Sequence, residues 1–274
     1  MQRRHQKIVE ETPSPLMTPE LRKEMGKAAV LAAKAVDYSG AGTIEFLVDN
    51  NLNYYFLEMN TRLQVEHPIT EEVLGVDLVK EQINVANNLP LRFKQEDIVQ
   101  RGHAIECRIC AEDTQNNFMP SPGVIKLLTE PLGIGTRVDS YVYEGFEIPM
   151  HYDPMIGKLI VWAVNRQYAL ERMRRVLYEY KITGIKTNIS YLRRIMDAAD
   201  FVEGKYDTHF IEKNTEFLSK SNHEESKAEA EDMAIIASYM DYLLNLEENS
   251  PKTVDNRPIS RWREFGKRSA MLRI

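Results

Sequence analysis

A hairpin of two β-rich runs is the sequence feature that most limits the fold. The runs TIEFLVD (residues 43–49) and NYYFLEMN (residues 53–60) flank the polar pair Asn50-Asn51, a pattern typical of a turn between paired strands. Glu45 falls in the first run, and Glu58 lies near the end of the second. Pairing of the two runs therefore places one carboxylate on each of two neighbouring strands.

Helical segments surround this hairpin. Thr18 can cap a helix that Pro19 opens, and apolar residues recur at helical spacing to about Asp37. Two shorter helices are expected around residues 70–75 and 77–88. The first hundred residues therefore predict a mixed arrangement of helices and strands.

The pattern changes near residue 100, where we expect a domain boundary. Strand-like runs, from GHAIECRI (102–109) to GKLIVWAV (157–164), alternate there with turns rich in Gly and Pro. Helices are expected near 166–180, 188–197 and 208–214. A polar linker, an amphipathic helix and a basic tail follow from about residue 216. The expected parts are residues 1–100, 101–215 and 216–274.

Charge and cysteine content narrow the class of protein. The net charge of −6 argues against a dedicated nucleic-acid binder, and no run of 18 apolar residues predicts a membrane span. Cys107 and Cys110 lie in one strand-like run, where residues three apart point to opposite faces. Neither a shared metal nor a disulfide is therefore expected, and the low cysteine content fits a cytoplasmic protein.

Charged residues at alternate positions mark a candidate site at the end of the hairpin. Glu58, Asn60 and Arg62 share one face of an extended strand, and Glu45 can add a second carboxylate. Carboxylate and amide oxygens suit Mg²⁺, and arginine suits a planar oxyanion or a phosphate. The apolar run around Glu58 predicts that this carboxylate is partly buried. The alternative is a solvated, charged strand edge.

Several motifs resemble the biotin-dependent carboxylase family within the ATP-grasp superfamily. FLEMNTRL (56–63) followed by QVEHP resembles the second signature of the family, and QRRHQK and AGTIEF occur before it in the same order. RGHAIECRI, FMPSPG, HYDPMIGKLI and GIKTN resemble its C-terminal domain. The resemblance covers residues 1–215. It implies an α+β fold in which the C-terminal part of an ATP-grasp domain precedes a biotin carboxylase C-terminal domain of antiparallel strands and helices.

The resemblance also implies a role for each matching residue. The metal ligands for Mg²⁺ or Mn²⁺ bridged to ATP would be Glu45, Glu58 and Asn60. The ligand-binding residues would be His5 near the nucleotide, Lys7 at the bicarbonate and phosphate site, and Gln64 and Val65 in the bicarbonate pocket. Arg62, in the same pocket, would be a catalytic residue together with Glu66 and Arg108. Glu66 would be the general base that deprotonates bicarbonate, and Arg108 would stabilise the biotin enolate.

The implied activity is the carboxylation of biotin on a carrier protein, driven by ATP through carboxyphosphate. This is the first half-reaction of an acyl-CoA carboxylase, such as the acetyl-CoA carboxylase of fatty acid biosynthesis. The implied partners are the biotin carboxyl carrier protein, a second copy of the chain and a carboxyltransferase subunit. Another ATP-grasp ligase is disfavoured because RLQVEHP would not be expected in it.

One expected part of the machinery has no counterpart in the sequence. An ATP-grasp enzyme needs a glycine-rich loop over the phosphates, and the lone GxG of Gly133 to Gly135 has no helix after it. We therefore expect a truncated chain that is inactive alone. The alternative is a non-catalytic dimerisation or assembly module.

Other polar residues carry weaker expectations. We expect His67 and His103 to be structural. A biotin-site role and a packing role both remain open for residues 151–153, and no role is fixed for Lys158 or Lys186. The segment after residue 216 could dock on the body of the protein or on a partner protein.

Overall fold

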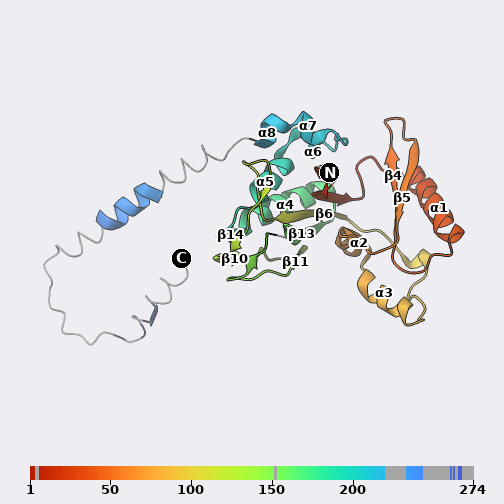
Figure 1. Ribbon diagram of the computed structural model, residues 1–274, viewed down its shortest axis with the longest axis horizontal. Coiled ribbons are helices and arrows are strands. Elements are labelled where there is room, and N and C mark those ends of the chain that lie inside the picture. Colours follow the sequence, from red (N-terminus) through yellow and green to blue (C-terminus); the bar gives the residue numbers. More distant parts are fainter. Residues whose placement is uncertain are drawn as a thin grey trace. The chain divides into compact units, whose positions relative to one another are not determined.

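The computed structural model describes residues 1–3, 6–150, 153–219, 233–242, 260, 262 and 265–266. The chain divides into two compact units, Met1–Lys220 and Ser221–Ile274. All the labelled elements belong to the first unit (Figure 1).

The N-terminal elements agree closely with the sequence pattern. Helix α1 (Pro19–Ala35) begins after Thr18, whose hydroxyl accepts a hydrogen bond from the Leu21 amide. The expected hairpin forms from β4 (Thr43–Val48) and β5 (Tyr54–Asn60). Helices α2 (His67–Leu74) and α3 (Leu78–Ala86) follow, with the short 3₁₀ turn η1 (Gln95–Asp97) after them.

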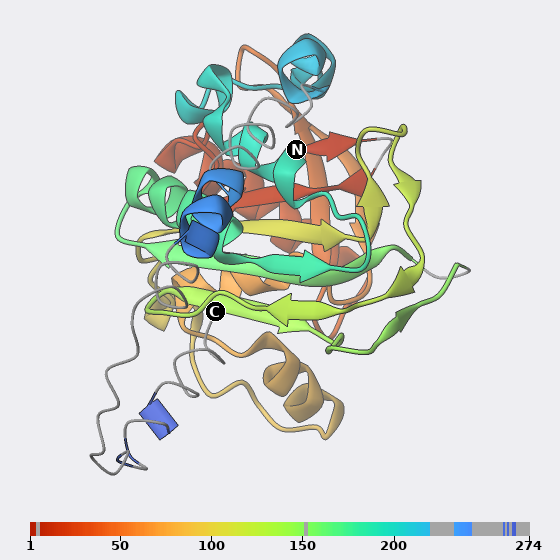
Figure 2. The ribbon, with the colours of Figure 1, turned by 90° about the vertical axis from the view of Figure 1, so that its left-hand side faces the viewer.

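A four-stranded antiparallel sheet forms the centre of the first unit. Its order is β11 (Thr136–Ser140), β13 (Met155–Ala163), β6 (His103–Cys110) and β3 (Val9–Thr12). Figure 2 shows these strands side by side. The edge strand β3 comes from the start of the chain, so the sheet unites segments from both sides of residue 100. The boundary near that residue stays a prediction.

Short strands and further helices complete the unit. The minor strand pairs are β1 (Gln2–Arg3) with β2 (Gln6–Lys7), β7 (Glu112–Asp113) with β8 (Met119–Pro120), β9 (Gly123–Val124) with β12 (Glu147–Ile148), and β10 (Leu127–Thr129) with β14 (Lys181–Thr183). The helices are α4 (Arg166–Glu179), α5 (Ile189–Asp197), α6 (Ala199–Val202), α7 (Phe210–Lys213) and α8 (Thr215–Ser219).

The two faces of the sheet differ in chemistry. One face carries Ile105, Cys107 and Ile109, which join the main apolar core together with residues of α4 and α5. Because side chains alternate along a strand, Glu106 and Arg108 point to the opposite face. There a small cluster seats α2: Ile69 and Val73 with Ala104 and Ile160. The same alternation separates Cys107 from Cys110, and both are free thiols as expected.

The second unit is described only in part. Residues 233–242 are helical, and their large exposed apolar side chains are Met233, Ile235, Ile236, Tyr239, Met240 and Tyr242. The rest of the expected linker and basic tail lies mostly outside the described residues. Among the helices that the structure describes, none has the length and apolar character needed to cross a membrane.

Candidate active site

A continuous chain of ion pairs links the hairpin to the central sheet. The Lys7 ammonium on β2 lies 3.0 Å from a carboxylate oxygen of Glu45 on β4. The same ammonium lies 2.7 Å from Glu66, the residue that directly precedes α2. Three segments that are distant in sequence therefore meet at one cation.

Arg108 continues this chain on the other side of Glu66. Its Nη2 lies 3.0 Å from the second carboxylate oxygen of Glu66 and 2.6 Å from Glu10 on β3. Its Nε also donates to Glu10, at 2.8 Å. Each oxygen of Glu66 thus faces a different cation, and this fixes the orientation of the carboxylate.

These contacts shift the titration of the groups involved. Burial opposes ionisation of Glu66, but the hydrogen bond from Lys7 and the charges of Lys7 and Arg108 lower the pKa of this carboxyl below its usual value. Burial likewise opposes the charged form of Lys7, while hydrogen bonds to Glu66 and Glu45 raise its pKa overall. Both groups are therefore charged at neutral pH, and Glu66 is able to accept a proton.

The three expected metal ligands lie together at the end of the hairpin. Glu45 and Glu58 stand directly opposite each other on β4 and β5. The Asn60 side-chain nitrogen lies 3.0 Å from Glu45 and 3.2 Å from Glu58. Two opposed carboxylates repel each other unless a positive group lies between them.

This donor set fits a hard divalent cation. Rotation of the Asn60 side-chain amide would turn its oxygen toward the position that its nitrogen now takes. Two carboxylates and one amide oxygen would then converge, which suits Mg²⁺ that keeps substrate phosphates and water as further ligands. Within the described ranges, no group of three or more His, Cys, Asp or Glu side chains could hold a metal ion.

Two expectations about this segment are wrong. Strand β5 ends at Asn60, so the alternation does not extend to Arg62, which is exposed and donates to the Leu63 carbonyl oxygen at 3.2 Å. Glu58 is exposed rather than partly buried. Its apolar neighbours Phe56 and Leu57 are exposed as well, so they provide no cover for the carboxylate.

The remaining expected ligand-binding residues border the chain of ion pairs. Gln64 is buried, and its side-chain nitrogen has no hydrogen-bond partner. Val65 follows, and its carbonyl oxygen accepts a hydrogen bond of 3.1 Å from Lys158 on β13. His5 lies outside the described residues. The loop before α2 is therefore tied to the central sheet through Lys158.

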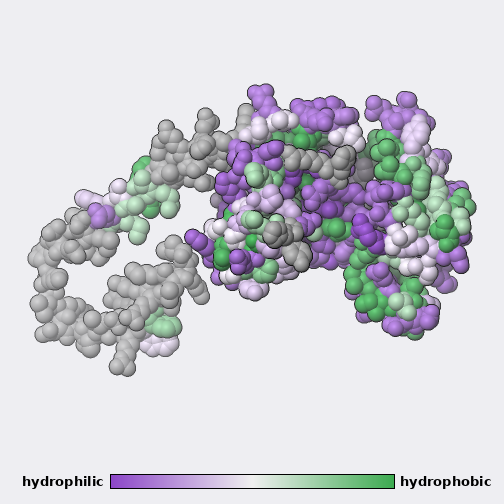
Figure 3. Space-filling model, in the orientation of Figure 1, coloured by the Kyte–Doolittle hydropathy of each residue, from purple (hydrophilic) through white to green (hydrophobic). Residues whose placement is uncertain are grey.

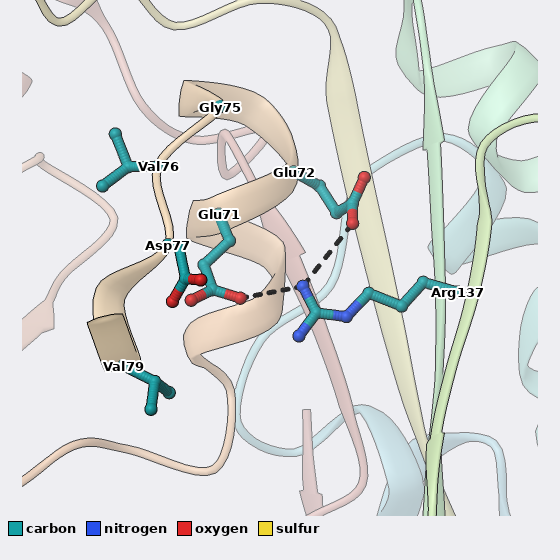
Figure 4. Close-up of a pocket in the computed structure, with 7 residues that line it drawn as sticks. All are labelled: Glu71, Glu72, Gly75, Val76, Asp77, Val79 and Arg137. Carbon is teal, nitrogen blue, oxygen red and sulfur yellow. Dashed lines mark hydrogen bonds and ion pairs between the residues drawn. The ribbon is translucent and has the colours of Figure 1, made fainter. Parts of the chain in front are cut away.

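A second anchor holds the far end of α2. Arg137 on β11 lies 2.8 Å from Glu71 and 3.6 Å from Glu72, both on α2. The other oxygen of Glu71 accepts the Leu78 amide at the start of α3. These side chains line a surface hollow of about 570 Å³, and Figure 4 shows Arg137 reaching across to the helix. Arg137 thereby helps to position the helix that begins beside Glu66.

The two histidines have local structural contacts. His67 Nδ1 lies 2.9 Å from the Gln64 carbonyl oxygen at the start of α2. His103 Nε2 lies 2.6 Å from Glu11, which Arg166 and Tyr206 also contact. Although burial opposes ionisation, these hydrogen bonds lower the pKa of Glu11. This cluster is a buried ion-pair network separate from Glu66.

Sequence reasoning missed Glu10 and Glu106 and left Lys158 open. All three lie on the face of the sheet that α2 covers, in β3, β6 and β13. Their grouping depends on the register of strands far apart in sequence. The acidic pair Glu10-Glu11 in a strand-like segment was the available signal, but it does not reveal its partner strand.

Two family models match the chain. The model of the biotin carboxylase C-terminal domain matches residues 106–213, and that of the ATP-binding domain of the carbamoyl-phosphate synthase L chain matches residues 1–94. The chain belongs to the biotin carboxylase family. The expected α+β fold, with an ATP-grasp part before a biotin carboxylase C-terminal domain, is thereby confirmed.

Relatives and solved structures agree with this membership. A pyruvate carboxylase subunit of Methanothermobacter thermautotrophicus is 58% identical over 212 residues, which are 77% of this chain and 43% of the relative. Biotin carboxylase 1 of Bacillus subtilis is 54% identical over 77% of this chain and 47% of its own length. The biotin carboxylase domain of a thermophilic 2-oxoglutarate carboxylase bound to bicarbonate gives a TM-score of 0.79 at 48% identity, covering 81% of this chain and 50% of that one. The chain thus spans about half the length of the biotin carboxylases that it matches.

Proposed function

We propose that this chain forms the metal, bicarbonate and biotin side of a biotin carboxylase active site. The observation that carries the proposal is the continuous contact from Glu45 through Lys7 and Glu66 to Arg108. It brings Glu45, one of the proposed metal ligands, together with a candidate base and two cations. Carboxylation of biotin requires these groups because anions must approach one another and two protons must be removed.

Glu66 acts as the base in this proposal. Its ionised carboxylate takes the proton of bicarbonate as the bicarbonate oxygen forms a bond to the γ-phosphorus of ATP and ADP leaves. Lys7, beside Glu66, balances the negative charge of bicarbonate and phosphate. Mg²⁺ held by Glu45, Glu58 and Asn60 would neutralise phosphate charge.

Arg108 acts on the second substrate. Carboxyphosphate breaks down to CO₂ and phosphate, and the phosphate takes the proton from the ureido nitrogen of biotin. Negative charge then develops on the adjacent oxygen until that nitrogen forms its bond to CO₂. A guanidinium already oriented by Glu10 and Glu66 can donate hydrogen bonds to that oxygen without further reorganisation. Arg62, Gln64 and the backbone amide of Val65 complete the bicarbonate pocket in this proposal, and His5 contacts the nucleotide.

The chain alone is proposed to be inactive. An extensive apolar surface covers α1, the hairpin and α3, visible as green patches on the right of Figure 3. Its exposed side chains include Val30, Leu31, Leu47, Phe56, Leu57 and Ile83. An apolar surface of this kind is typical of an interface. We propose that it packs against the polypeptide that supplies the nucleotide-gripping loop.

The partners and the final acceptor are further proposals. A biotin carboxyl carrier protein would present biotin at Arg108, and a transferase component would choose the acceptor. Relatives named for pyruvate and for methylcrotonoyl-CoA match alongside plain biotin carboxylases, so acetyl-CoA and fatty acid biosynthesis stay a prediction. A cytoplasmic location also stays a prediction, since some relatives are chloroplastic.

Self-association is proposed through the turn between β10 and β11. Leu132 and Ile134 are 81% and 88% exposed in this turn and offer two neighbouring aliphatic side chains to a partner surface. A solved relative is described as a biotin carboxylase domain dimer. This surface also supports the alternative function, a non-catalytic dimerisation or assembly module.

Phosphate release from ATP tests the proposal. The chain would be compared with a fusion that places the N-terminal segment of the Bacillus subtilis relative before residue 1. We expect biotin-dependent hydrolysis of ATP, requiring bicarbonate and Mg²⁺, in the fusion alone. Hydrolysis in neither protein, with dimerisation retained, would favour the assembly module.

A further inference from the structure

Glu106 is a carboxyl group that takes no part in the series of ion pairs from Glu45 to Glu10. It lies on β6 with an exposed fraction of 0%, and neither of its oxygens has a hydrogen-bond partner. An ionised carboxylate in such a place loses its hydration without gaining a hydrogen bond in return. Protonation removes most of that cost.

The register of the sheet places Glu106 directly beside the candidate site. It stands opposite Glu10 on β3 and two positions before Arg108 on the same face of β6. Charged groups from every element on this face lie around it: Glu10 of β3, Arg108 of β6, Lys158 of β13, Arg137 and Asp139 of β11, and Glu66, Glu71 and Glu72 of the segment that forms α2. Asp139 pairs with Lys158, and Glu71 and Glu72 pair with Arg137. The positive charge of the Met1 amino group also acts on Glu10, where it opposes the rise in the pKa of this carboxyl.

Burial and the nearby charge of Glu10 raise the pKa of Glu106 to about 9. Lys158 and Arg108 oppose this shift but do not cancel it. Burial raises the pKa of Glu10 as well, although Arg108 lies 2.6 Å from it. Glu106 and Glu10 thus both lie near the Arg108 guanidinium, which also contacts Glu66.

We propose that Glu106 remains protonated beside Arg108 and thereby keeps the Arg108 guanidinium available to a small oxyanion next to Glu66. Arg108 already contacts the carboxylates of Glu10 and Glu66. A third carboxylate at Glu106 would compete for it and repel an incoming anion. Glu106 is thus a positioning residue that acts through Arg108. The inference rests on the proposed function, because bicarbonate and the biotin enolate are the oxyanions of that site.

The proton on Glu106 can be detected without any ligand. A carboxyl that keeps its proton only in the folded state makes the protein less stable as pH rises from the unfolded pKa, near 4.5, to the folded pKa, about 9. The unfolding equilibrium constant of the unmodified chain, here called the parent, should rise by up to about tenfold per pH unit relative to that of the Glu106→Gln variant. The glutamine of this variant cannot ionise. Urea unfolding of both proteins between pH 6 and pH 10 measures this difference.

Glu81→Gln is the matched control for this first measurement. Glu81 is also a buried glutamate, but its carboxylate is paired with Arg92, which follows α3 in the chain. We expect Glu81→Gln to lower the free energy of unfolding at each pH. The decrease in stability with rising pH should remain in this variant. A Glu106→Gln variant that behaves in the same way would overturn the proposal, because Glu106 would then be an ionised partner of Lys158 or Arg108.

Nitrate tests the link to anion binding. It is planar like bicarbonate and keeps one negative charge throughout this pH range. Nitrate affinity is read from the stabilisation that nitrate produces over chloride at equal ionic strength. In the parent, we expect nitrate affinity to fall about tenfold from pH 7 to pH 10 as a negative charge forms near Arg108. In Glu106→Gln, the affinity should stay nearly constant.

The two measurements separate the two proposals. Suppose that stability decreases with pH as expected, but that nitrate affinity falls equally with pH in the parent and in Glu106→Gln. Glu106 then holds a proton that has no effect on Arg108, and the inference is wrong. If nitrate binds neither protein at any pH, the proposed oxyanion site itself fails and the link from Glu106 to that site fails with it. If the expected decrease in stability with pH is absent, the inference fails whether or not nitrate binds.

Discussion

The Lys7 ammonium lies 2.7 Å from the Glu66 carboxylate, although the two residues belong to separate elements on either side of the hairpin. The hydrogen bond from Lys7 lowers the pKa of Glu66. If Glu66 is the base, as we propose, it is ionised before any substrate arrives. Its basicity is set by a neighbour that can itself contact the substrate anion.

Loss of Lys7 should therefore move the acid limb of the pH–rate profile. In Lys7→Gln of the fusion protein, the pKa of Glu66 rises, so the low-pH loss of activity should shift to higher pH by about one unit. Lys205→Gln is the control, since Lys205 pairs with Glu203 on the surface. An acid limb that does not move in Lys7→Gln would show that Lys7 does not set the titration of the base.

Glu66→Ala should lower turnover of the fusion protein by about 10²- to 10⁴-fold, the usual contribution of a positioned base. Initial rates of biotin-dependent phosphate release at saturating substrates measure this effect. Glu96→Ala removes an exposed carboxylate of η1 and should leave turnover unchanged. Turnover that is unaffected by Glu66→Ala would contradict the assignment of the base.

Metal binding can be measured on the chain itself. Glu45→Gln and Glu58→Gln should each weaken Mn²⁺ binding by at least about tenfold, because each removes one of the two opposed carboxylates. The fraction of free Mn²⁺ in an electron paramagnetic resonance titration reports this affinity. Glu24→Gln on α1 should change nothing. Equal affinity in all four proteins would place the metal site elsewhere.

Arg137→Ala should destabilise the chain by about 1–2 kcal/mol, because it leaves the largely buried Glu71 carboxylate without its cation. Arg175→Ala breaks an exposed pair with Glu179 within α4 and should cost no more than about 0.5 kcal/mol. Urea unfolding compares the two variants. Equal losses would show that the contact between Arg137 and Glu71 does not hold α2 on the sheet.

Local patterns predicted much of the structure correctly. Thr18 and Pro19 marked the start of α1, and two β-rich runs around a polar turn gave the hairpin that joins Glu45 to Glu58. The family motifs selected Lys7, Glu66 and Arg108, and the structure brings them into contact. That contact agrees with the assigned roles, which stay predictions.

The rest depends on long-range pairing that no local pattern contains. Glu10 and Glu106 meet because β3 pairs with β6, and only the register of that pairing puts both carboxyls on the side of Arg108. The error at Arg62 has a local cause, since the alternation of side chains ends where the strand ends. Burial of Glu58 could not be judged from apolar neighbours that are themselves exposed.

Transfer of ¹⁴C from labelled bicarbonate to free biotin tests the central claim most directly. The fusion protein would be incubated with ATP, Mg²⁺ and biotin, alongside its Glu66→Gln variant. We predict ATP-dependent formation of carboxybiotin by the fusion and a loss of at least about a hundredfold in the variant. No carboxybiotin from a folded fusion that binds ATP, or equal amounts from both proteins, would contradict the claim.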